Sequence, residues 1–231
     1  MKIAFISDTH CKHAEIDSQL RGKGIDILIH SGDGSNHKER VFNNNELRDC
    51  LAWMESFSNI KHKIYVPGNH DTSLESGLVR KDDFKSINIL INESLEIIGE
   101  KIIKIYGSPI TPSFGTGWAY NCKRNKIDKY WNMIPNDTNI LVTHGPAKGI
   151  LDKTEDFDRK IVNVGCKALF NKIMEVQPMY HAFGHLHDEY GFLNHGTKTL
   201  GEKCKTTFIN SSIVNLKHRV VNGPIIIDYK F

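Results

Sequence analysis

The chain has 231 residues, of which 39% are hydrophobic and 25% charged, and its formal net charge is +3. This composition is that of a globular protein with a substantial core, and we expect a single domain over residues 1–231. The small net charge argues against a stable nucleic-acid complex. Five scattered cysteines exclude a disulfide framework, and the apolar run Ile3–Ile6 is too short for a signal peptide or a membrane span. We therefore expect a cytoplasmic protein without a membrane partner.

The first half of the chain alternates predicted strands and helices. Buried strands are predicted for three short apolar runs, residues 2–6, 25–30 and 63–66. A short helix is expected over residues 14–20, a longer amphipathic helix over 43–57, and a helical turn or two within 73–84. This order of elements is typical of parallel strands joined by helical crossovers.

The second half has a different pattern. Closely spaced β-rich runs indicate antiparallel pairing among residues 87–91, 95–98 and 101–106. After an irregular loop, two further helices are predicted over residues 123–134 and 164–176, and residues 152–160 are expected to be a solvated charged segment. Four more strands are predicted at residues 140–143, 179–183, 206–209 and 224–229. The fold class is therefore α/β with mixed sheets.

Side chains that can bind metal follow five of the predicted strands. They are Asp8 and His10, Asp33, Asn69 and His70, His144, and His185 and His187. Ligands bind beyond the carboxyl ends of parallel strands, so these residues are expected at one site. In an extended D-x-H or H-x-H segment both side chains lie on the same side of the backbone, so each pair can grip a metal ion.

This donor set predicts a dinuclear metal centre. Seven oxygen and nitrogen donors, with His70 left over, suit two ions about 3.5–4 Å apart that share one carboxylate. The set has four imidazoles and no thiolate, which favours Mn²⁺ first, then Fe or Zn²⁺, over Ca²⁺ or Mg²⁺ alone. The other seven of the twelve histidines are interpreted as structural or solvated: His13, His30, His37, His62, His181, His195 and His218.

The ordered motifs resemble those of the calcineurin-like metallophosphoesterase superfamily. They are Asp8-x-His10, Gly32-Asp33, Gly68-Asn69-His70-Asp71, His144 and Gly184-His185-x-His187. The second half, including residues 105–109, 140–146 and 224–228, is similar to the metallophosphoesterase-domain-containing (239-type) brain protein subfamily of class III cyclic nucleotide phosphodiesterases. The resemblance implies a four-layer αββα sandwich.

It also implies a role for each motif residue. Asp8, His10 and His187 would hold one ion, Asn69, His144 and His185 the second, and Asp33 would bridge the two. His70 would stay off the metals as general acid, with Asp71 orienting its ring. The implied reaction is hydrolysis of a cyclic nucleotide or another small phosphodiester by a hydroxide shared between the two ions.

Three alternatives remain open at this stage. A phosphomonoesterase or a nuclease would use the same site, and a non-catalytic interaction module on this fold would use none of it. The complete ligand set and His70 favour an enzyme. Trp118 and Tyr120, which follow the loop at residues 107–117, either stack on a ligand or pack the loop onto the core.

Overall fold

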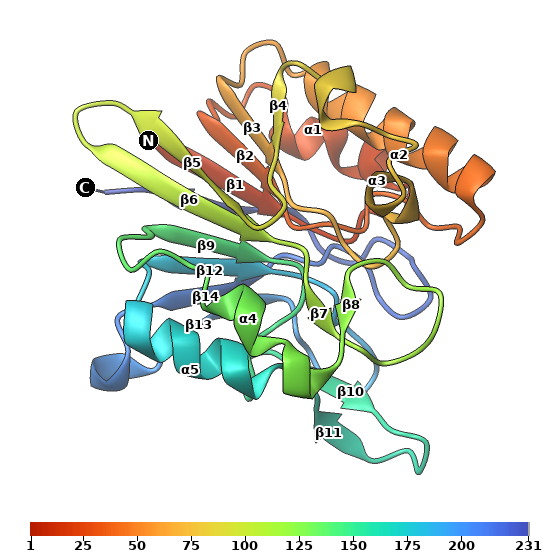
Figure 1. Ribbon diagram of the computed structural model, residues 1–231. Helices are drawn as coiled ribbons and strands as arrows, with labels where there is room; N and C mark the ends of the chain where they lie inside the picture. The colour runs from red at the N-terminus through yellow and green to blue at the C-terminus, as the bar shows by residue number, and fades with distance from the viewer. Residues whose placement is uncertain (231) are drawn as a thin grey trace.

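The computed structural model describes residues 1–230 and contains two central sheets packed face to face (Figure 1). The first sheet has the order β15 (Ile225–Asp228), β1 (Lys2–Ile6), β2 (Ile27–His30), β3 (His62–Tyr65) and β4 (Ile87–Ile89). Strands β1 to β4 are parallel, whereas β15 pairs with β1 in the antiparallel sense. The predicted alternation of strands and helices in the first half is confirmed.

The second sheet is mixed. Its order is β13 (Gly196–Lys198), β14 (Thr207–Asn210), β12 (Tyr180–Phe183), β9 (Ile140–Thr143), β6 (Ile102–Ser108) and β5 (Glu93–Ile98). The four inner strands run parallel, and the two edge strands pair with them in the antiparallel sense. The antiparallel pairing predicted for the second half therefore belongs to the edges of this sheet.

Helices cover the outer face of each sheet (Figure 1). The first sheet carries η1 (His13–Ile16), α1 (Asp17–Leu20), α2 (Arg40–Glu55) and α3 (Thr72–Glu75). The second carries α4 (Asp128–Trp131) and α5 (Lys167–Val176). Short 3₁₀ turns occur at η2 (Lys81–Asp83), η3 (Arg124–Lys126) and η4 (Gly201–Lys203). The expected four-layer αββα arrangement is confirmed. Within residues 1–230, no helix is long and apolar enough to cross a membrane.

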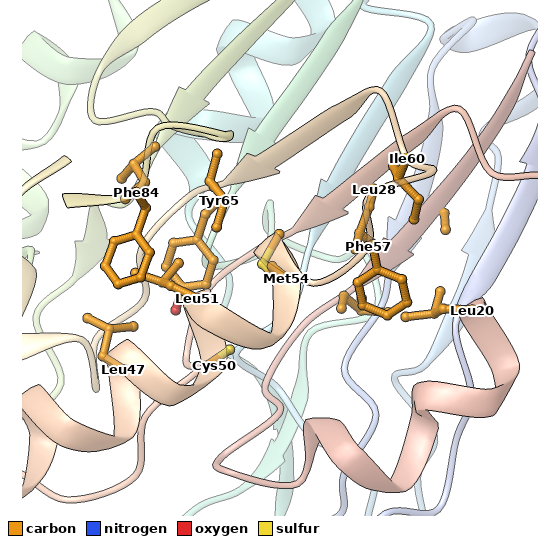
Figure 2. Close-up of a cluster of buried hydrophobic side chains, with 14 of the residues drawn as sticks. Leu20, Leu28, Leu47, Cys50, Leu51, Met54, Phe57, Ile60, Tyr65 and Phe84 are labelled. Carbon is orange, nitrogen blue, oxygen red and sulfur yellow. The ribbon is translucent and has the colours of Figure 1, made fainter. Parts of the chain in front are cut away.

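Alternate residues of strands β1 and β2 face two different hydrophobic cores, one on each face of the first sheet. One face of β1 and β2 packs against the second sheet through Ile3, Phe5, Ile27 and Ile29, which meet isoleucines and valines of β6 and β9. The opposite face packs on α2, whose Leu47, Leu51 and Met54 belong to the same buried cluster as Leu28 and Tyr65 (Figure 2). Strands buried on both faces read as continuous apolar runs, which is why the sequence revealed them.

Two segments differ from the predictions. Strand β4 pairs with β3 rather than with β5, because Asn92, with φ of +56°, turns the chain from one sheet to the other. The segment expected to be solvated contains a hairpin, β10 (Lys153–Glu155) and β11 (Ile161–Asn163). Its side chains are largely exposed on both faces, so no alternation of apolar residues marks it.

Three smaller differences concern the chain near the irregular loop. The predicted helix over residues 123–134 is limited to η3 and α4. Two short strands, β7 (Thr111–Pro112) and β8 (Asn121–Cys122), pair with each other and close the loop between them at its base. Edge strand β13 was also not predicted. These three strands have two or three residues each, too few to show a periodic pattern.

Candidate metal centre

The predicted metal-binding side chains lie just beyond the carboxyl ends of five strands. Strands β1, β2 and β3 lead to Asp8 and His10, Asp33, and Asn69. Strands β9 and β12 of the other sheet lead to His144 and to His185 and His187. The two sheets are linked here, because the backbone N–H of Ile213 donates to the Ser7 carbonyl over 3.1 Å. The site therefore lies where the two sheets meet.

Four of these residues have a left-handed backbone conformation. The φ angles are +54° at Asp8, +39° at His10, +57° at Asp33 and +69° at His185. Such values are uncommon for residues other than glycine, and they persist where the surrounding structure fixes them. Here the β1 and β2 loops hold each other, since the N–H of Asp8 donates to Gly32 and that of His10 donates to Asp33. The strained backbone turns the side chains toward the site.

Two glycines allow the loops to approach closely. A Cβ atom at Gly68 would collide with the Asp33 carboxylate and the His144 ring, and one at Gly184 would collide with the side chains of Asp8 and Ser7. Glycine is therefore required at both positions by the neighbouring side chains.

The first group of donors consists of Asp8, His10 and His187. The Nε2 atoms of His10 and His187 are 3.4 Å apart, and Nε2 of His187 is 3.3 Å from Oδ1 of Asp8. Donor atoms that each bind an ion at about 2.0–2.2 Å lie about 3.0–3.5 Å from one another around it. Both distances to His187 fit a shared divalent ion. Within the described residues, the group of donors that all lie within 4.8 Å of one another here combines His10 and His187 with His218 rather than with Asp8.

The second group consists of Asn69, His144 and His185, together with Asp33. Nε2 of His144 lies 2.9 Å from Oδ1 of Asn69 and 3.2 Å from Oδ2 of Asp33. His185 offers a donor atom within 4.8 Å of those of Asp33 and His144. The same carboxylate oxygen of Asp33 is 4.0 Å from Nε2 of His10, so Asp33 lies between the two groups.

Hydrogen bonds orient the rings for metal binding. Nδ1 of His10 pairs with the Ser35 carbonyl at 3.2 Å, and Nδ1 of His144 pairs with the Ser31 carbonyl at 2.8 Å. A carbonyl only accepts, so each Nδ1 carries a proton, and each ring, once neutral, has its Nε2 lone pair free for the site. Such backbone partners are usual for imidazoles that bind metals.

Burial and charge shift the pKa values of the clustered groups. Burial lowers the pKa of His185 to about 3, since it disfavours the charged ring. Burial also opposes ionisation of Asp8, but the hydrogen bond and charge of His187 outweigh it and lower the pKa of Asp8. At His144 burial is outweighed by the Asp33 carboxylate, which raises the pKa of His144 to about 9. The carboxylates thus stay ionised, as metal ligands must.

His70 is not one of the seven predicted ligands, but a ring nitrogen of His70 lies within 4.8 Å of donor atoms of His10 and Asp33. Its Nδ1 pairs with the Asn36 carbonyl at 2.7 Å, and its Nε2 is 4.0 Å from Oδ2 of Asp33. Its backbone N–H donates to Oδ1 of Asp33 over 2.7 Å. The ring is thus oriented by a backbone carbonyl and placed beside the central carboxylate.

The predicted pairing of Asp71 with the His70 ring is wrong. The Asp71 carboxylate is fully buried on the other side of the backbone, where it accepts hydrogen bonds from the backbone N–H groups of Asp33 and Gly68 and from the hydroxyls of Tyr65 and Ser35. Residues 68–71 form a turn in which the Asp71 N–H donates to the Gly68 carbonyl, and this turn brings the Asp71 carboxylate back onto the Gly68 N–H, which explains the error. Asp71 fixes the loops that carry the ligands, not the ring of His70.

One histidine at the site was not among the predicted site residues. His218, from the turn after β14, stacks on the ring of His10, with ring centroids 4.0 Å apart and an angle of 7° between the planes. His30 and His181, by contrast, are fully buried in their strands as expected. The loop at residues 107–117 adds the exposed Phe114, whose ring centroid is 5.0 Å from that of His185. Neither His218 nor Phe114 belongs to a motif.

The fold and this cluster define a class of αββα protein with a candidate two-metal centre at the junction of its sheets. The chain belongs to the calcineurin-like phosphoesterase family, whose sequence pattern matches residues 1–189. Members of this family use divalent metal ions, and membership indicates a phosphoester hydrolase.

Several known proteins are similar over most of the chain. Human metallophosphoesterase domain-containing protein 1 is 30% identical, over 96% of this chain and 69% of its own. A UPF0046 protein of Caenorhabditis elegans is 32% identical, over 98% of this chain and 74% of its own. The crystal structure of TT1561 from Thermus thermophilus has a TM-score of 0.56 at 11% identity, covering 93% of this chain and 89% of that one. A further crystal structure has a TM-score of 0.65 at 14% identity, covering 94% and 91%.

Proposed function

We propose that this protein is a dinuclear-metal-dependent phosphodiesterase that hydrolyses cyclic nucleotides or similar small diesters, with residues 1–231 acting as one domain. The observation that carries the proposal is the position of His70, whose Nε2 is 4.0 Å from Oδ2 of Asp33 and which neither donor group needs for its set of ligands. An imidazole placed there can protonate a leaving oxygen while seven other side chains hold metal. A pure binding module has no need of such a residue.

In this proposal each donor group holds one divalent ion, and Asp33 contributes to both. When bound, the ions supply Lewis acidity toward the phosphoryl oxygens and a water nucleophile of lowered pKa. The chain itself orients the ester and provides His70. With Nδ1–H donating to the Asn36 carbonyl, Nε2 is the nitrogen that remains for the ester, and the ring would give a proton from Nε2 as an imidazolium and become neutral. Mn²⁺ is the proposed ion, with Fe or Zn²⁺ as alternatives, since oxygen and imidazole donors are mixed.

The residues at the rim of the site suit a substrate that carries an organic group on its phosphate. The Trp118 ring centroid is 4.6 Å from that of His70, and the Lys38 ammonium lies 3.5 Å from the centre of the Trp118 ring. A cavity of about 300 Å³ on this side is lined by Lys38, Arg40, Thr72, Glu75 and Trp118 among others. Aromatic and cationic groups beside the proposed acid suit the base and phosphate of a nucleotide.

The test is a substrate panel with the full chain in added Mn²⁺. It contains 2′,3′- and 3′,5′-cyclic nucleotides, aryl diesters and the matching aryl monoesters, with single-stranded and duplex oligonucleotides as separate arms. We expect turnover of the cyclic nucleotides and diesters, loss of turnover with a chelator, and recovery on adding metal back. His62→Phe, a substitution at the start of β3, is a matched control that should keep full activity.

Each alternative has its own outcome in this panel. Preference for monoesters would favour a phosphomonoesterase, and faster cleavage of oligonucleotides than of cyclic nucleotides would favour a nuclease. No turnover of any substrate by metal-loaded protein would favour the interaction module. A cytoplasmic setting is also part of the proposal and is supported by the five cysteines, all of which are free thiols.

A further inference from the structure

His218 lies on a turn between β14 and β15 that is fixed by its own hydrogen bonds. The backbone N–H of His218 donates to the Asn215 carbonyl over 2.8 Å, and Oδ1 of Asn215 accepts from the N–H groups of Lys217 and Arg219. His218 itself has φ of +51°, the left-handed conformation that such a turn requires. The turn is also tied to the segment after His187, because the N–H of Leu216 donates to the Asp188 carbonyl.

This turn places the His218 ring among three other imidazoles. It lies parallel to His10, and it meets His187 and His70 edge to face, with ring centroids 5.4 Å and 6.0 Å away. Ring nitrogens of His218, His10 and His187 all lie within 4.8 Å of one another. His218 is therefore part of the wall of the proposed metal centre on the side of the first donor group.

The stacking argues against His218 as a further ligand of the ion held by His10. An imidazole binds a metal through a lone pair in its own ring plane. The planes of His10 and His218 are inclined by only 7° with centroids 4.0 Å apart. An ion about 2.0–2.1 Å from a nitrogen of one ring cannot then lie in the plane of the other.

The His218 ring nevertheless has hydrogen-bonding capacity that the protein does not use. Within residues 1–230 no side-chain hydrogen bond of His218 occurs, and the residue is half-buried. A neutral imidazole always carries one N–H, whichever tautomer it adopts. A ring that is rigidly placed at the mouth of a metal centre, with a free N–H, is equipped to bind an anionic ligand there.

We propose that His218 is a substrate-positioning residue that donates a hydrogen bond to a phosphoryl oxygen of the ester. This inference rests on the proposed function, because it needs the phosphate at the two-metal site. His218 then holds the phosphoryl group from the side of His10, and His70 serves the leaving oxygen from its own side. The two rings have different roles. His218 contributes to binding of the phosphoryl group in both the ground state and the transition state, and His70 contributes to turnover.

The test compares two substitutions in the full-length protein loaded with Mn²⁺. His218→Phe keeps an aromatic ring over His10 but removes the N–H, whereas His218→Asn keeps an N–H donor. Inorganic phosphate is the probe, titrated calorimetrically, and metal content is measured by elemental analysis. We expect His218→Phe to bind phosphate about tenfold more weakly, the usual effect of losing a hydrogen bond to a charged group, with metal content unchanged.

Kinetics add a readout that a purely structural role would not change in the same way. For the best substrate of the panel we expect His218→Phe to raise KM about tenfold with kcat within threefold of wild type, and His218→Asn to restore much of the loss. His62→Phe is the control for replacing a half-buried histidine with phenylalanine elsewhere. Unchanged phosphate affinity in His218→Phe would overturn the inference. So would loss of metal, since that would make the residue a ligand or a support of one.

Failure of this inference and failure of the proposed function give different results. A wild-type protein that turns over no ester but binds phosphate through His218 would contradict the phosphodiesterase and keep the assigned contact. A protein that turns over diesters equally well with His218→Phe would keep the phosphodiesterase and remove the contact. Wild-type protein that binds two ions but no phosphate would contradict the contact directly.

Discussion

Oδ2 of Asp71 accepts a hydrogen bond of 3.0 Å from the backbone N–H of Asp33, and this bond connects the loop after β3 to the loop after β2. The same oxygen accepts from the Gly68 N–H and the Tyr65 hydroxyl, each over 2.7 Å. The Asp71 carboxylate is thus a buried clamp beneath the candidate metal centre. Burial and the nearby charge of Asp33 both raise the pKa of Asp71, and the donors around it act in the opposite direction.

The clamp predicts a large loss of stability on truncation. Asp71→Ala would leave the buried donors of Asp33, Gly68, Tyr65 and Ser35 without their acceptor, at about 1–3 kcal/mol for each unsatisfied group that water cannot reach. We expect the free energy of unfolding, measured in urea on metal-free protein, to fall by more than about 3 kcal/mol. Asp82→Ala, at an exposed aspartate, is the control and should change it by less than about 0.5 kcal/mol. Equal stabilities for the two variants would contradict the clamp.

His70→Gln should separate turnover from metal binding. We expect two ions per chain to be retained, because His70 lies outside both donor groups, and kcat to fall by about 10²–10⁴-fold for substrates with alkoxide leaving groups. Activated aryl diesters need less proton donation, so their loss should be much smaller. The measurement is kcat for both substrate types beside metal content. A uniform loss for alkyl and aryl esters would argue against a general acid.

The central position of Asp33 predicts an asymmetry among ligand substitutions. Asp33→Asn weakens both donor groups, whereas His185→Ala removes a donor from the second group only. After dialysis against metal-free buffer, we expect Asp33→Asn to retain less than one ion per chain and His185→Ala to retain about one of the two ions proposed. Asp82→Asn should retain the wild-type content. Two tightly held ions in Asp33→Asn would rule out the shared carboxylate.

The places of the candidate ligands in the fold were predictable from sequence because they depend on a simple rule. Each follows a strand whose apolar run is unmistakable, and the carboxyl ends of parallel strands meet at one edge. Asp8 and His10, and likewise His185 and His187, were predicted as pairs from the alternation of side chains in extended chain. The structure brings them to the site differently, because Asp8, His10 and His185 have left-handed backbone conformations that no strand rule predicts.

The features that were missed depend on long-range contacts or on loop geometry. His218 reaches the site because Asn215 shapes its turn and Asp188 holds that turn against the loop after β12. The partner of Asp71 was misassigned because adjacency in sequence suggested contact with His70, while the turn at residues 68–71 folds the Asp71 carboxylate onto the Gly68 N–H. Strands β10 and β11 are exposed on both faces and carry no hydrophobic signature. In each case the deciding information lies in a turn rather than in a periodic pattern.

The raised pKa of His144 predicts that metal binding releases protons. In metal-free protein the Asp33 carboxylate raises the pKa of His144 from 6.5 to about 9, so the ring is protonated at pH 7.5, whereas bound metal requires it neutral. Burial lowers the pKa of His185, and the pKa of Asp33 is also lowered, so neither of these second-group donors has a proton to lose at that pH. We expect the second ion to release about one proton at pH 7.5 and its affinity to rise with pH, levelling off above pH 9. The same shift affects the stability of the metal-free protein. Because the pKa of His144 is higher in the folded state than in the unfolded state, the protonated ring stabilises the fold. This stabilisation is complete below pH 6.5 and is lost as the pH rises through 9. Calorimetric titration with Mn²⁺ in buffers of different ionisation enthalpy measures the proton count, and no release at pH 7.5 would show that His144 is already neutral.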